Sequence, residues 1–83
     1  MEYDEIRITT RREITICEAE INRLEKDIAA LERKYGKGSD EFFRDHNVDL
    51  LPADKDISRW HESRLALVRW QERLAAHQQI MKL

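Results

Sequence analysis

Apolar residues recur at alternating steps of three and four along the first half of the chain. The residues in this pattern are Ile14, Cys17, Ile21, Leu24, Ile28, Leu31 and Tyr35. The spacing places them on one narrow stripe of an α-helix, at the a and d positions of a heptad repeat, where they need a partner helix. Thr10 to Glu13 has the form of a capping box and Gly36 follows the last periodic residue, so we expect a helix over residues 10–36.

Three further segments complete the pattern. A second amphipathic helix is predicted over residues 55–82, with a broad apolar face that includes Val68 and Ala75. Ser39 is a suitable N-cap for a short helix over residues 39–46. Residues 5–9 alternate between polar and apolar types, so we expect a short strand or a frayed arm over residues 1–9, and we favour fraying or an extension of the first helix over the strand.

Charged residues beside the apolar stripes indicate which helices pair. The e and g positions of the first helix hold Glu18, Glu20, Glu25, Asp27, Glu32 and Lys34. Two copies of this helix would bring like charges together, whereas the second helix offers Arg64 and Arg73 beside its own stripe. We therefore expect an all-α fold, an antiparallel helical hairpin about 35–40 Å long in a single domain over residues 1–83. Because a hairpin leaves apolar surface open, we expect it to associate, either as a dimeric four-helix bundle or in a complex with a different protein.

Composition narrows the classes of function. The chain has 83 residues, 41% of them apolar and 39% charged, and a net charge of −2, which argues against binding nucleic acid or a membrane surface through bulk charge. One Cys excludes an intramolecular disulfide. No apolar run approaches the roughly 20 residues of a membrane span, and the acidic N-terminus lacks the apolar core of a secretory signal. We therefore expect a cytoplasmic protein.

No arrangement of residues predicts catalysis, a cofactor or a metal. His46 lies among acidic residues, but the spacing matches no ligand pattern, and the Ser residues have no base at a recognisable distance. We therefore expect that the protein is not an enzyme and binds no cofactor. Arginines recur along the second helix, at Arg59, Arg64, Arg69 and Arg73. They scatter around the helix, so we interpret them as partners for the acidic residues of the first helix.

One segment resembles a known family. Four features occur in order: the segment Leu31-Glu32-Arg33-Lys34-Tyr35-Gly36, the segment Ser39-Asp40-Glu41-Phe42, an acidic connector, and Trp60 early in the second helix. Together they resemble small antitoxin-like proteins of prokaryotic toxin–antitoxin operons. This resemblance implies a helical hairpin that binds and occludes a toxin, with no catalysis of its own.

The residues expected to bind a protein partner lie mainly on the second helix. They are Leu65, Arg69, Trp70, Arg73, Ala76 and Ile80, together with Phe42 and Phe43 of the short helix. An amphipathic helix with spare apolar surface can lie in a groove of a partner. Two other interpretations stay open: a homo-oligomeric structural coiled coil without a toxin partner, and a small DNA-binding protein whose N-terminal strand pairs across a dimer.

Overall fold

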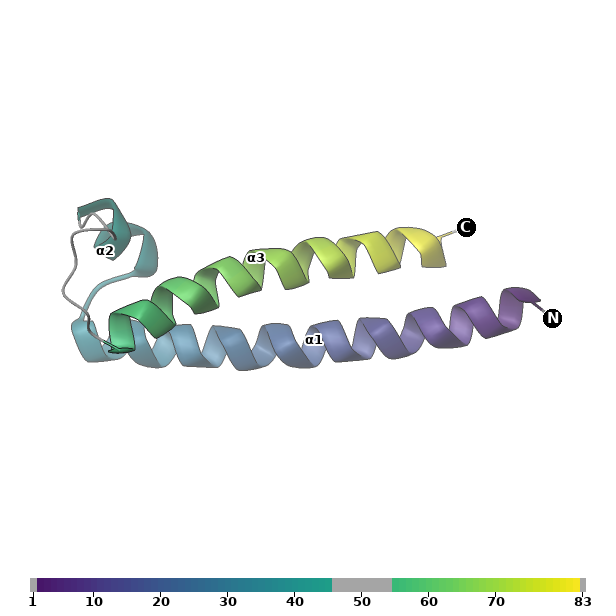
Figure 1. The fold of residues 1–83 in the computed structure, drawn as a ribbon, viewed down its shortest axis with the longest axis horizontal. Coiled ribbons are helices and arrows are strands. Elements are labelled where there is room, and N and C mark those ends of the chain that lie inside the picture. The colour runs from purple at the N-terminus through teal and green to yellow at the C-terminus, as the bar shows by residue number, and fades with distance from the viewer. Residues whose placement is uncertain (1, 46–54, 83) are drawn as a thin grey trace.

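Two long antiparallel helices and one short helix make up the described chain. The computed structural model describes residues 2–45 and 55–82, and the side chains of residues 4–44 and 55–82. Helices α1 (Glu2–Tyr35) and α3 (Lys55–Met81) lie side by side, and α2 (Ser39–Asp45) packs at the end where they are connected (Figure 1). The predicted all-α helical hairpin is confirmed. No helix among the described residues is long and apolar enough to cross a membrane.

The first helix begins much earlier than the sequence pattern predicts. From Glu2 onwards α1 is continuous, so the expected strand or frayed arm over residues 1–9 is wrong there and the structure has the alternative, an extension of the first helix. Thr10 is buried inside the helix, and its hydroxyl donates to the Ile6 carbonyl oxygen at 2.7 Å, so it cannot form the expected capping box. Because acidic residues near the start favour the helix dipole, this segment extends the helix. The molecule is consequently 54 Å long rather than 35–40 Å.

The turn after α1 follows the predicted chemistry. Gly36 has a φ of 68°, the left-handed conformation in which a residue with a Cβ is strained. The Lys37 amide donates to the Glu32 carbonyl oxygen at 3.2 Å, as in a Schellman C-cap. The short helix α2 then begins at Ser39 as expected. His46, its predicted last residue, and the predicted connector over 47–54 lie outside the described residues.

The core is asymmetric between the two long helices. On α1 the buried apolar residues are Cys17, Ile21, Leu24, Ile28 and Leu31, all members of the predicted stripe. On α3 only Trp60 and Ser63 are buried among the described residues, both near its N-terminal end. Val68 and Ala75, predicted on the broad apolar face of this helix, are exposed because α1 covers only a narrow strip of it. The hairpin is therefore packed most tightly at its closed end.

Candidate protein interface

Aromatic side chains fill the closed end of the hairpin. The Trp60 ring is fully buried and stacks on Phe42 at 4.6 Å and on Tyr35 at 5.6 Å between ring centroids. Phe43 meets Trp60 edge to face at 5.2 Å. Ile28 and Leu31 of α1 complete this cluster. Because rings from α1 and α2 pack on the indole of α3, α2 is fixed against the two long helices.

A hydrogen-bonded chain runs beside the aromatic cluster. The Trp60 indole N–H donates to the Ser39 hydroxyl oxygen at 2.8 Å, and that hydroxyl donates to Glu32 Oε2 at 3.0 Å. The Ser39 backbone N–H donates to the same Glu32 oxygen at 2.7 Å. Ser39 was predicted as an N-cap, but its side chain instead connects α1 to α3. Among the described residues no buried side-chain nitrogen or oxygen lacks a hydrogen-bond partner.

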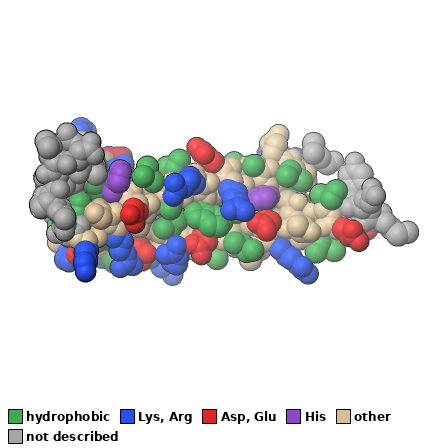
Figure 2. Space-filling view, in the orientation of Figure 1, with side chains coloured by type: hydrophobic (Ala, Val, Ile, Leu, Met, Phe, Trp, Pro, Cys, Tyr) green, Lys and Arg blue, Asp and Glu red, His purple; other side chains and the backbone are tan. Residues whose placement is uncertain are grey.

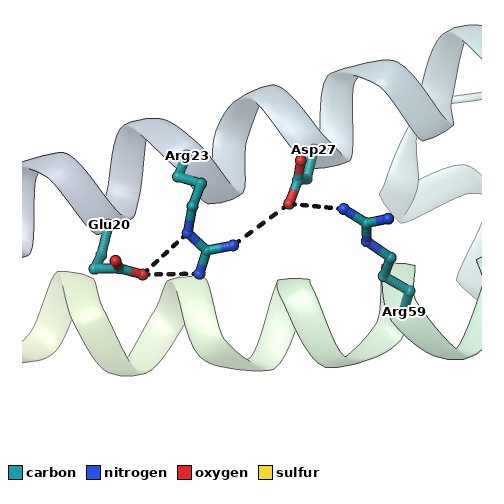
Figure 3. A network of polar contacts seen from close by, with 4 residues as sticks. All are labelled: Glu20, Arg23, Asp27 and Arg59. Carbon is teal, nitrogen blue, oxygen red and sulfur yellow. Dashed lines mark hydrogen bonds and ion pairs between the residues drawn. The ribbon is translucent and has the colours of Figure 1, made fainter.

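Ion pairs between the long helices follow the predicted charge pattern for Arg59 and Arg73, but the expected pairing of Arg64 with the first helix is wrong, because Arg64 contacts Asp40 of α2 instead. Arg59 is 3.4 Å from Asp27, and Arg73 is 3.8 Å from Glu13. Arg23 connects Glu20 to Asp27 along α1, so four charged side chains form one network (Figure 3). The hydrogen bond from Arg23 to Glu20 raises the pKa of the guanidinium further above its usual value. These pairs are exposed, so each sets helix orientation more than stability.

The ion pairs define one side of the hairpin. Glu13, Glu20 and Asp27 recur every seven residues on α1, and residues seven apart lie on the same side of a helix. Ile6 precedes Glu13 by seven residues, and Ile80 follows Arg73 by seven, so both continue this side toward the termini. We call this side the ion-pair face. Its residues are Ile6, Glu13, Glu20 and Asp27 of α1 and Arg59, Ala66, Arg73 and Ile80 of α3.

The opposite side of the hairpin carries α2. Arg64 follows Arg59 by five residues, a rotation of about 140° around the helix. Its guanidinium lies 2.8 Å from Asp40 and 4.9 Å from the centroid of the Phe43 ring. The short helix is therefore held against this side. In the described part of the chain it leaves the ion-pair face open.

The structure divides the eight predicted partner-binding residues into three groups. Five of them form one exposed row on α3, namely Leu65, Arg69, Arg73, Ala76 and Ile80. Trp70 is half-buried and has the Arg73 guanidinium 5.2 Å from its ring centroid. Phe42 is buried in the core, so its assignment to a partner surface is wrong, and Phe43 is partly buried in the same aromatic cluster. The α3 row is the part that remains available for binding.

Among the side chains that the structure describes, four large apolar ones outside the predicted partner-binding residues are also exposed. Ile6, Ile8 and Ile16 of α1 and Val68 of α3 are each about half exposed. Figure 2 shows one long face of the hairpin, on which apolar and charged side chains alternate along its length. Ile16 lies three residues after Glu13 and four before Glu20, so it borders the ion-pair face. The heptad positions of these residues could have identified them once the pairing of α1 with α3 was fixed.

No group of three or more His, Cys, Asp or Glu side chains is placed to hold a metal ion in the described part of the chain. Cys17 is fully buried at a d position, as predicted for a small apolar residue. What the geometry provides is surface: a folded hairpin with exposed apolar side chains between arginines. Comparison with known proteins found no matching family model, curated protein or solved structure.

Proposed function

We propose that the chain is a protein-binding helical hairpin of the antitoxin-like kind, which neutralises a partner protein by covering part of its surface and carries out no reaction itself. The observation that supports this function is the exposed row on α3. Leu65 and Ile80 in this row are 49% and 43% exposed although the hairpin is fully folded. Large apolar side chains grouped on a surface are typical of protein interfaces.

The row has the spacing of a helix that binds in a groove. Its members Leu65, Arg69, Arg73, Ala76 and Ile80 follow one another at steps of four, four, three and four. Side chains at these steps lie on one side of a helix and enter a groove together. Arginine is enriched among the residues that contribute most to binding energy. The partner expected from this chemistry has an apolar groove with carboxylates along its edges.

The experiment is co-expression of this chain with the product of the neighbouring gene, followed by isothermal titration calorimetry of the purified pair. Leu65→Glu should weaken binding about tenfold or more, since it places a carboxylate in an apolar contact. Ile8→Glu is the matched control, because Ile8 has similar exposure to Leu65 but lies on α1. Growth of cells that express the partner alone, compared with cells that express both proteins, tests neutralisation.

Two outcomes would contradict the proposal. The first is that the two gene products form no complex at micromolar concentration. The second is that Leu65→Glu and the Ile8→Glu control bind with equal affinity, which would place the contact elsewhere. Because Leu65 is exposed, neither result can be attributed to a loss of folding when circular dichroism shows an intact hairpin.

A further inference from the structure

The isolated hairpin exposes more surface than a compact protein of its size. Its accessible surface is 6479 Å² for a chain of 10.0 kDa. Monomeric proteins of that mass expose about 5,200 Å². The excess is therefore about 1,200–1,300 Å², and obligate homodimers bury about 1,000–2,500 Å² per chain. Association with a second copy would bring the exposed area per chain into the usual range.

Three of the six large apolar side chains that are exposed among the described residues lie on or beside the ion-pair face. Ile6 and Ile80 lie on this face near the termini, and Ile16 borders it. The ion pairs fix the register of the two helices. In both Asp27–Arg59 and Glu13–Arg73 the two residue numbers add up to 86. Ile6 and Ile80 satisfy the same relation, so they lie at the same level. The open end of the face therefore presents an apolar patch beside a charged region.

Charge along the ion-pair face is divided between its two helices. The α1 half carries Glu13, Glu20 and Asp27 with Arg23 between the last two, so it is net negative, and the α3 half carries Arg59 and Arg73. A two-fold axis parallel to the helices would place α1 of one copy on α3 of the other, so that acidic residues meet basic ones. An axis across the helices would place α1 on α1 and α3 on α3, which brings like charges together. Only the first arrangement also brings Ile6 of one copy to the level of Ile80 in the other.

We propose that a second copy of this chain covers the ion-pair face, with the two hairpins parallel and their closed ends together. The result is a four-helix bundle in which every neighbouring pair of helices is antiparallel, the arrangement that helix dipoles favour. Contacts form between α1 of each copy and α3 of the other. Leu65 and Val68 stay outside the contact, whereas Arg73 and Ile80 belong both to the α3 row and to the ion-pair face, so a second copy and the proposed partner protein would compete for these two residues.

Sedimentation equilibrium on the full chain tests the association. Twice the 10.0 kDa chain mass is expected at micromolar concentration. Ile6→Glu should weaken the dimer about tenfold or more, because a buried apolar contact becomes a buried charge. Ile8→Glu is the matched control: Ile8 is 52% exposed and Ile6 is 54%, but Ile8 lies on the other side of α1. On α3 the same comparison uses Ile80→Glu as the test variant and Val68→Glu as its control.

The orientation of the two copies is tested by distance. Arg33 is exposed in the last turn of α1, so a spin label on Arg33→Cys marks the closed end, and the fully buried thiol of Cys17 stays unlabelled. Parallel hairpins place two such labels about 20–30 Å apart across the bundle, whereas antiparallel hairpins separate them by about 45 Å along it. Pulsed electron–electron double resonance measures both ranges.

Each result decides the inference. A dimer that Ile6→Glu weakens and Ile8→Glu does not, with the shorter label distance, supports it. A mass of one chain up to millimolar concentration overturns it. Equal effects of Ile6→Glu and Ile8→Glu, or the longer distance, also overturn it. Loss of binding to the partner protein through Leu65→Glu, with an unchanged dimer, separates this inference from the proposed function.

Discussion

Replacement of Ser39 by alanine removes the hydroxyl that connects Trp60 to Glu32. The Ser39 backbone N–H keeps its 2.7 Å hydrogen bond to Glu32, so the substitution isolates the side chain. The Trp60 indole N–H, in a ring that is fully buried, then loses its acceptor. A buried donor without a partner costs about 1–3 kcal/mol. Because Ser39 is itself partly exposed, water can partly replace the hydroxyl, and we expect the lower half of this range, about 1–2 kcal/mol.

Thermal unfolding followed by far-UV circular dichroism measures this loss. For a domain of this size, each kcal/mol lowers Tm by about 4–8 °C, so a loss near the middle of the expected range lowers Tm by about 6–12 °C. Ser39→Thr keeps a hydroxyl and should stay close to the wild type, and Ser58→Ala removes an exposed hydroxyl from α3. All variants are compared at one protein concentration, since association shifts Tm. A Tm of Ser39→Ala within the range of Ser58→Ala would refute the reasoning.

Three further substitutions or treatments test other parts of the structure. Gly36→Ala should cost about 1 kcal/mol in the free energy of unfolding, because its φ of 68° strains a residue with a Cβ. Gly38→Ala is the control and should be nearly neutral. Urea unfolding that ranks the two variants in the opposite order contradicts the C-cap assignment. Arg59→Ala should lower the free energy of unfolding by less than about 0.5 kcal/mol, since the pair of Arg59 with Asp27 is exposed. A loss above about 1 kcal/mol that high salt abolishes would show instead that the network in Figure 3 is a major source of stability. Cys17 should react with a thiol reagent only after denaturation by guanidinium, and rapid reaction in the native protein would contradict its burial.

Strictly periodic parts of the fold were predictable from the sequence. The stripe from Ile14 to Tyr35 gave the orientation of α1, because steps of three and four place residues on a single side of a helix. Gly36 marked the end of that helix for a stereochemical reason that no neighbour can change. The acidic positions of α1 correctly indicated α3 as its partner, as the Arg59–Asp27 and Arg73–Glu13 pairs confirm.

Parts that depend on tertiary contacts were not predictable in the same way. Residues 2–9 contain two isoleucines in an alternating pattern, and the helix forms there because it continues an existing one. The positions of Phe42 and Phe43 could not be ranked before it was known which ring stacks on Trp60. The pairing of Ile6 with Ile80 required the register that the ion pairs fix. The predicted partner-binding row on α3 therefore stays a prediction, and the exposed isoleucines of α1 beside it came from the structure.

The distribution of aromatic residues has a consequence for how the hairpin loses its structure. Tyr35, Phe42, Phe43 and Trp60 all lie at the closed end, whereas on α3 the inward side chains beyond Ser63 are only partly buried. Local opening costs the least free energy where few apolar contacts must be broken. In a single, unassociated hairpin, amide hydrogens near Ile6 and Ile80 should therefore exchange with solvent long before those near Leu31 and Trp60. A hairpin built this way can change the separation of its terminal segments while its closed end stays folded.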